Sequence, residues 1–320
     1  MRKNILFIIL VLSIGLLVFS LKNDFILQNI ATVLWSKPIA VLGPDIPFTI
    51  DNVIVNFGNL NILIVPGHEP NKGGGEYKTI KERDLNVQIA QEIANELQTD
   101  SNFKVIVSRD YYSWNSILKS YFDKQSTEIK NFIKDHSETM KSAVKEGTVS
   151  LINNVYHNKA DEETVLHLYG LNKIISEQKV DLVIHVHVND YPGRKYNKVG
   201  KATGFSIYVP ESQYKNSISS KLLAEAVFPF LNNEIATSTL PQEQKGIVED
   251  QDLIAIGSKN TLTKPCILIE YGYIYESIYS TTKNRKSGFQ NFGRATADGI
   301  KNFINKNLKI ILADRENTIN

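Results

Sequence analysis

Histidine and carboxylate side chains recur in four short segments that lie far apart in the chain. His68 follows an apolar run and a Pro-Gly turn, and Glu82 opens a stretch whose apolar residues have helical spacing. His185 and His187 end a second apolar run, and Glu270 interrupts a third. Imidazole and carboxylate groups are the usual ligands of catalytic zinc, and a further carboxylate can transfer protons. The four segments together indicate a zinc hydrolase.

His68 has the most informative local sequence of these residues. A histidine directly after a strand and a Pro-Gly turn is held at the carboxyl edge of a sheet, where neutral imidazole is a natural zinc ligand. A lone histidine in such a loop is more often a surface group. The metal role is favoured here because three other candidate segments accompany His68.

Glu82 fits two roles that the residues alone leave open. Apolar residues recur at a spacing of four over 82–97, which predicts a helix that begins at Glu82. A carboxylate in the first turn is favoured by the helix dipole, so Glu82 could simply cap this helix. It could instead bind a metal, in which case Asp84, on another face of the same helix, is the rival ligand.

His185 and His187 lie two residues apart in a strand predicted over 180–188, so both side chains point to the same side. One of them is expected to bind the metal. The other could donate a hydrogen bond to a metal ligand or compete for the metal. The remaining histidines occur in polar surroundings with helical character and are predicted to be surface groups: His136, His157 and His167.

Glu270 is a carboxylate in an otherwise apolar strand predicted over 265–271. Burying an unpaired carboxylate is costly, so this residue is expected to be ion-paired, metal-ligating or catalytic. Arg109 is the candidate partner for an ion pair. Cys266 in the same strand is expected to be a small buried hydrophobic residue rather than a nucleophile. As the single cysteine of the chain, it also excludes an internal disulfide and a cysteine-based zinc site.

The elements that must position these residues alternate between strand and helix. Further apolar patterns predict strands over 61–65, 103–107 and 205–209 and helices over 163–178, 217–231 and 291–308. Together they predict an α/β fold, a three-layer α/β/α sandwich with a mostly parallel or mixed central sheet. The 320 residues, 42% hydrophobic and 22% charged, suffice to bury the core of one such domain. The net charge of +2 says little about partners, but the lack of a basic stripe with interleaved aromatic residues argues against nucleic acid.

The N-terminus indicates the compartment. Arg2 and Lys3 precede an uncharged apolar run over 5–21, which is near the shortest length that spans a bilayer. The basic flank favours a cytoplasmic N-terminus. A transmembrane signal-anchor over 1–23 is preferred to a cleaved signal peptide, because the run ends without a small-x-small cleavage site. We therefore expect a single-pass protein of the cell membrane whose catalytic domain is extracytoplasmic, or a secreted protein if the segment is cleaved.

The rest of the chain divides into a spacer, a catalytic domain and a tail. Residues 24–60 contain three prolines and are predicted to be a spacer with one or two added strands around 48–56. The catalytic domain is expected over 61–310 and a C-terminal tail over 311–320. Within the domain, residues 114–162 form a polar stretch of helical character with a few apolar positions that could dock one face.

The motifs around the candidate residues resemble those of the zinc-dependent N-acetylmuramoyl-L-alanine amidases, a family of cell-wall enzymes. The matching motifs are Pro66-Gly67-His68, Glu82-Arg83-Asp84-Leu85-Asn86, His187-Val188-Asn189 and Glu270-Tyr271-Gly272-Tyr273. The chain departs from the family pattern at Val65, where Asp is usual, and at His185, where serine is usual. Its glycines also come later than usual after the first histidine, at 73–75.

The resemblance implies a role for each motif. His68, Glu82 and His187 would hold Zn²⁺, and Glu270 would be the general base that activates water. The substrate would be peptidoglycan, cleaved at the amide between N-acetylmuramic acid and L-alanine of the stem peptide. Two alternatives remain. One is a zinc amidohydrolase or carboxypeptidase that acts on another amide, and the other is a catalytically silent wall-binding or regulatory protein.

The stretch 114–162 is longer than the corresponding part of the simplest members of this family. We expect it to be a helical insertion that controls access to the zinc site, because some of these amidases carry an inhibitory helix in a comparable place. An arm that binds a regulatory protein is the alternative, since long insertions in surface loops cost little closure entropy.

Overall fold

The computed structural model describes residues 60–152, 157 and 159–319 of the chain. The predicted signal-anchor over 1–23 and all but the last residue of the predicted spacer lie outside this part. Within the described residues, no helix combines the length and the apolar character that a membrane span requires.

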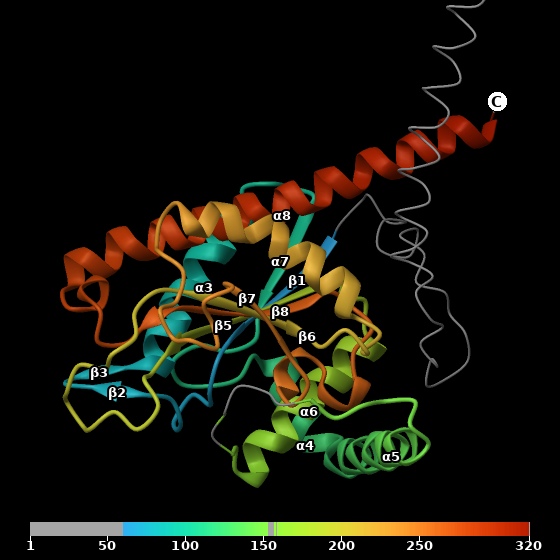
Figure 1. Cartoon of the computed structure of the whole chain (residues 1–320), viewed down its shortest axis with the longest axis horizontal. Helices are drawn as coiled ribbons and strands as arrows, with labels where there is room; N and C mark the ends of the chain where they lie inside the picture. Colours follow the sequence, from blue (N-terminus) through green and yellow to red (C-terminus); the bar gives the residue numbers. More distant parts are fainter. Residues whose placement is uncertain (1–59, 153–156, 158, 320) are drawn as a thin grey trace, which may run out of the picture. The chain divides into compact units, whose positions relative to one another are not determined.

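A six-stranded sheet runs through the middle of the domain (Figure 1). In spatial order its strands are β4 (Phe103–Val107), β1 (Leu60–Pro66), β5 (Leu182–Asn189), β8 (Cys266–Tyr273), β6 (Ser206–Pro210) and β7 (Ile247–Asp250). The first four are parallel, β6 is antiparallel to β8, and β7 is parallel to β6. The predicted mixed sheet is therefore confirmed, with the short edge strand β7 as an addition that the sequence did not predict.

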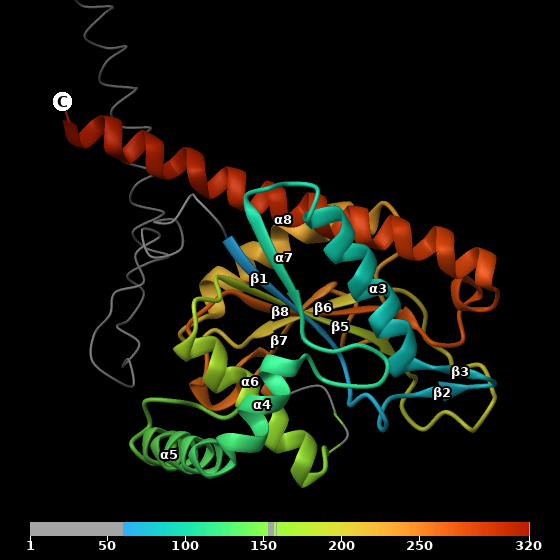
Figure 2. The same ribbon diagram turned by 180° about the vertical axis from the view of Figure 1, so that it is seen from behind.

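Helices cover both faces of the sheet, as the two opposite views show (Figures 1 and 2). One face carries α3 (Glu82–Leu97) and α7 (Ser217–Asn232), and α8 (Thr282–Ile319) packs against both of them. The other face carries α4 (Ser116–Lys124), α5 (Ser126–Lys145) and α6 (Glu162–Glu177). The predicted three-layer sandwich is thus the observed architecture.

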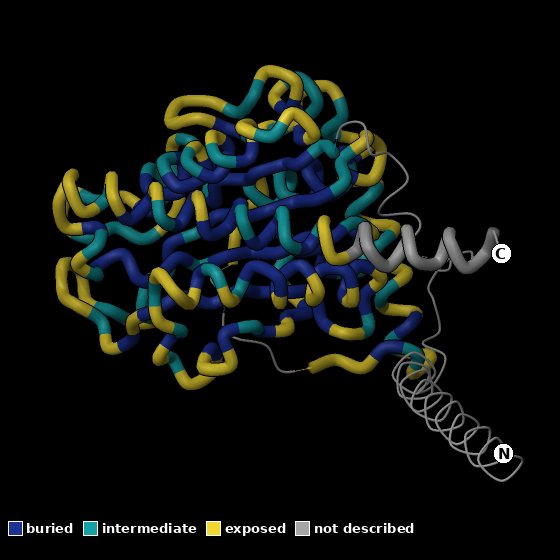
Figure 3. Tube along the Cα trace, turned by 90° about the horizontal axis from the view of Figure 1, so that it is seen from above, coloured by how far each residue is buried: buried dark blue, intermediate teal, exposed yellow. Residues whose placement is uncertain are grey.

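Alternating side chains of the strands explain why the sheet is covered on both faces. In β1, Ile62 and Ile64 join the core under α3, α7 and α8, whereas Leu63 and Val65 join the core under α4 and α6. Successive side chains of a strand point to opposite faces, so an almost continuous apolar run needs a partner on each side. Figure 3 shows this burial as dark blue segments through the centre, with exposed residues along the outer turns.

The closing helix α8 begins nine residues before the predicted start at 291. Thr281 caps it, because the Thr281 hydroxyl accepts a hydrogen bond from the backbone N–H of Asn284 at 3.1 Å. The first turns are polar and exposed, and the apolar stripe begins only at Phe289. Apolar periodicity therefore could not reveal the first two turns.

The described part of the predicted helical insertion contains α4 and α5, and both helices contribute to the core. Leu118 and Phe122 of α4 and Ile129 of α5 are buried. They pack so closely on α6 that a Cβ atom at Gly170 would lie 2.9 Å from Phe122 and 3.0 Å from Ile129. Removing this insertion would uncover the apolar side of α6.

Candidate active site

Three neighbouring parallel strands bring the predicted site residues to one edge of the sheet. His68 lies two residues after β1, His187 lies near the end of β5, and Glu270 lies in β8. Carboxyl ends of parallel strands meet at the same edge, which is where α/β domains place their functional groups. Glu82 reaches this edge as the first residue of α3, which follows a short hairpin formed by β2 (Glu76–Tyr77) and β3 (Ile80–Lys81).

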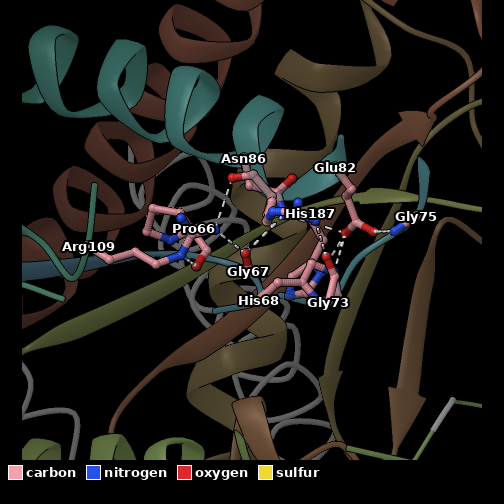
Figure 4. Close-up of polar contacts among 10 residues, drawn as sticks. Pro66, Gly67, His68, Gly73, Gly75, Glu82, Asn86, Arg109 and His187 are labelled. Atoms are coloured by element: carbon pink, nitrogen blue, oxygen red, sulfur yellow. Dashed lines mark hydrogen bonds and ion pairs between the residues drawn. The ribbon is translucent and has the colours of Figure 1, made fainter. Parts of the chain in front are cut away.

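The side chains of His68, Glu82 and His187 converge (Figure 4). Glu82 Oε1 lies 2.7 Å from His68 Nε2 and 3.1 Å from His187 Nδ1. One donor atom from each residue lies within 4.8 Å of the other two, close enough to hold one metal ion. Glu82 is buried, and both histidines are partly exposed.

Glu82 is oriented by the loop before α3 and by Asn86 of the helix itself, whose Nδ2 donates to Glu82 Oε1 at 3.4 Å. Glu82 Oε2 accepts a hydrogen bond from the backbone N–H of Gly75 at 2.7 Å, so the carboxylate does not cap α3. Burial alone would raise the pKa of Glu82, but the two adjacent imidazoles hold this pKa well below its usual range. The rival Asp84 is not part of the cluster.

The late glycines after His68 are part of the site. His68 has a φ of 68°, and Gly74, with a φ of 83°, packs against it. A Cβ atom at Gly74 would lie 3.0 Å from His68 Cδ2 and 3.1 Å from Glu82 Cβ. At Gly67 a Cβ atom would lie 2.2 Å from the ring of His187. Both positions need glycine because the backbone approaches the cluster so closely.

Glu270 faces the same side of the sheet as His187, its register partner in β5. The residue is partly exposed, but Oε2 is enclosed and has no hydrogen-bond partner among the described residues. Burial of the carboxyl group raises the pKa of Glu270 well above its usual value, and the negative charges of Glu82 and Glu243 add to this effect. A carboxylate with a raised pKa accepts a proton more readily than an ordinary one, as a general base must.

Residues 62–302 match the sequence profile that describes N-acetylmuramoyl-L-alanine amidases. The chain belongs to this family. It is therefore an N-acetylmuramoyl-L-alanine amidase, an enzyme that hydrolyses amides of the cell wall. No curated protein sequence matches the chain.

Solved structures of amidases resemble this one at low sequence identity. An N-acetylmuramyl-L-alanine amidase from Mycobacterium abscessus is 12% identical, with 77% of this chain and 98% of that one covered and a TM-score of 0.50. AmiC2 of Nostoc punctiforme is 16% identical, with 77% of this chain and 97% of that one covered and a TM-score of 0.48. CwlD of Clostridioides difficile, in complex with the GerS lipoprotein, is 18% identical, with 79% of this chain and 100% of that one covered and a TM-score of 0.47. The first of these likenesses shows a shared amidase fold.

His185 does not join the cluster of this amidase. Its side chain is buried on the same face of β5, bonds to the backbone of Ala255, and leaves Nε2 without a partner among the described residues. Burial, with a smaller contribution from His187, lowers the pKa of His185 to about 3. The structure therefore brings His187, and not its neighbour, to Glu82.

Arg109 does not pair with Glu270, so the alternative of an ion pair between them is not observed. Arg109 is buried, and its guanidinium donates to the carbonyl oxygens of Pro66 at 3.1 Å, of Gly67 and of Arg83 at 3.0 Å. Desolvation lowers the pKa of Arg109 to about 10, so the group is still charged at neutral pH. One side chain thus fixes both the turn before His68 and the first turn of α3, a role that sequence reasoning missed.

His157 and His167, which were predicted to be surface groups, are partly exposed and each contacts a buried carboxylate. His167 Nδ1 lies 2.9 Å from Glu69 Oε1, and His157 Nε2 lies 2.8 Å from Asp250 Oδ2. Both carboxylates are buried. The two histidines are thus partners of buried acids.

Proposed function

We propose that the amidase uses zinc, held by His68, Glu82 and His187, to cleave the amide between N-acetylmuramic acid and L-alanine of the stem peptide. The observation that carries the proposal is the convergence of two imidazoles and one carboxylate from three separate elements. This donor set is typical of catalytic zinc sites, which keep a further coordination position open. The residues fit the ion because their three donor atoms converge, and Gly67 and Gly74 lie against them where a Cβ atom would collide.

Each residue then has a distinct task. When bound, zinc supplies a Lewis acid that polarises the scissile carbonyl and lowers the pKa of water. Glu270 removes the proton of the attacking water and passes it to the leaving amine. Its raised pKa suits this exchange, because a base that is too weak would not take the proton. Arg109 keeps the two ligand-bearing segments together.

Localisation follows from the substrate and from the N-terminal sequence. We propose that the apolar run over 5–21 anchors the chain in the cell membrane, with Arg2 and Lys3 on the cytoplasmic side. The amidase domain would then lie outside, where peptidoglycan is. Protease added to intact spheroplasts should digest the domain. Recovery of the domain from the medium with a new N-terminus near residue 21 would show a cleaved signal peptide instead.

Product analysis tests the bond that is cleaved. Purified peptidoglycan is incubated with the protein, with and without a chelator, and the new ends are identified by mass spectrometry. Free L-alanine amino groups and intact lactyl carboxyl groups, formed only without the chelator, are expected. New ends at another amide would indicate a different zinc amidohydrolase. Binding to peptidoglycan without any new ends would indicate a silent wall-binding protein.

A further inference from the structure

The residue next to His68 is held from outside the candidate site. Glu69 is buried, with 5% of its surface exposed. Its Oε2 accepts a hydrogen bond from Trp114 Nε1 at 2.8 Å, and its Oε1 lies 2.9 Å from His167 Nδ1. Both oxygens of a buried acid are therefore used by partners that are distant in sequence.

The two partners of Glu69 belong to a group of three rings, which we call the aromatic platform: Trp114, Phe122 and His167. The Phe122 and His167 rings stack with centroids 4.5 Å apart, and Trp114 meets them edge-on at 5.2 Å and 5.5 Å. Trp114 opens the insertion, Phe122 lies in α4, and His167 lies in α6. The platform therefore forms only where the insertion docks on α6.

The backbone conformation of His68 depends on these contacts of Glu69. His68 has a φ of 68°, a left-handed conformation that non-glycine residues adopt only when their surroundings hold it. A buried carboxylate without partners is costly, so Glu69 would turn toward water if the platform were lost. Because Glu69 directly follows His68, such a movement would also turn the imidazole away from Glu82.

We infer that Glu69 is a positioning residue through which the aromatic platform sets the orientation of His68 and hence the zinc affinity of the site. This inference rests on the proposed zinc site. In this inference the insertion supports the orientation of a zinc ligand, whereas the sequence led us to expect that it controls access to the zinc site. The same loop is tied to α6 a second time, by Lys72 with Asp161 and Glu163, but those ion pairs are exposed and contribute little.

Two variants test the positioning role directly. Glu69→Ala removes the carboxylate, and Trp114→Phe removes the N–H donor and part of the ring system while it keeps an aromatic ring beside Phe122. We expect both to weaken zinc binding about tenfold or more, the usual cost of losing a residue that supports a ligand. Glu69→Gln, which still accepts from Trp114, should restore most of the affinity. Zinc dissociation constants are measured by competition with a chelator, and thermal unfolding is measured on the zinc-free protein.

Two control variants separate positioning from general stability. Tyr121→Phe removes a hydrogen bond between α4 and Glu177 of α6 without touching the platform, and Lys72→Met removes the exposed tie. Both should bind zinc like the parent. Unchanged affinity in folded Glu69→Ala and Trp114→Phe, or equal weakening in Tyr121→Phe, would overturn the positioning role alone. A parent protein that binds no zinc would overturn the proposed function, and this inference with it.

Discussion

His187 and Glu270 are register partners on neighbouring parallel strands, with both side chains on one face of the sheet. Backbone hydrogen bonds of β5 and β8 thus set the separation of a proposed zinc ligand and a proposed base. Neither side chain needs the other for its position. Substituting one is therefore expected to leave the second in place, which makes the two roles separable by experiment.

Glu270→Gln should abolish most turnover while it retains the metal. The amide has nearly the shape of the carboxylate but cannot accept the proton, and a positioned general base contributes about 10²–10⁴-fold to the rate. Zinc content and peptidoglycan hydrolysis are measured on the same preparation. Full activity in the zinc-loaded variant would remove the base role, and loss of zinc would make Glu270 a ligand.

The same substitution should change how stability depends on pH in the zinc-free protein. Burial raises the pKa of Glu270 above its ordinary 4.5, so the folded state favours the protonated form. The contribution of this group to stability is present below pH 4.5 and is lost as the pH rises through the folded-state pKa. Glu270→Gln does not titrate, so its stability relative to the parent should increase with pH. Thermal unfolding of both proteins between pH 4 and pH 9 measures the difference, and parallel curves would argue against a buried carboxylate.

His187→Ala and His185→Ala should differ in metal content. His187 contributes to the three-residue cluster, whereas His185 bonds to the backbone of Ala255 within the core. We expect His187→Ala to lose most of its zinc and His185→Ala to keep one equivalent, as measured by elemental analysis after dialysis. The reverse pattern would show that the two histidines have been assigned the wrong way round.

Arg109→Met should destabilise the domain. The apolar side chain leaves the carbonyl oxygens of Pro66, Gly67 and Arg83 without their buried donor, at a cost of about 2–4 kcal/mol in the free energy of unfolding. Urea denaturation of the zinc-free protein measures this cost. Arg294→Met, at an exposed position of α8, is the control and should change stability little. Equal stability of the two variants would argue against the bridging role of Arg109.

The central strands and the site residues on them could be predicted from sequence because the pattern there is local. A polar residue that interrupts an apolar run, as Glu270 does, marks the point where a buried strand reaches a site. The helix from Glu82 is likewise visible in its apolar spacing. Fold class and the four candidate residues therefore followed from short segments and from the family resemblance.

Other parts depend on contacts between distant segments and gave no local signal. Strand β7 has four residues and the strands of the β2–β3 hairpin have two each, too short for periodicity to show. The pairing of Glu69 with Trp114 and His167 spans 45 and 98 residues of sequence. The partners of Arg109 could not be predicted, because nothing near it in sequence indicates the carbonyl oxygens that it binds.

Zinc titration of the metal-stripped enzyme tests the central claim most directly. The parent and Glu82→Gln are treated with a chelator, dialysed, and assayed on purified peptidoglycan as zinc is added back. We predict that the parent regains hydrolysis in proportion to zinc until one equivalent is bound, and that Glu82→Gln needs far more zinc and remains slow. Hydrolysis that survives complete removal of zinc, or a Glu82→Gln variant that titrates like the parent, would contradict a zinc site built from His68, Glu82 and His187.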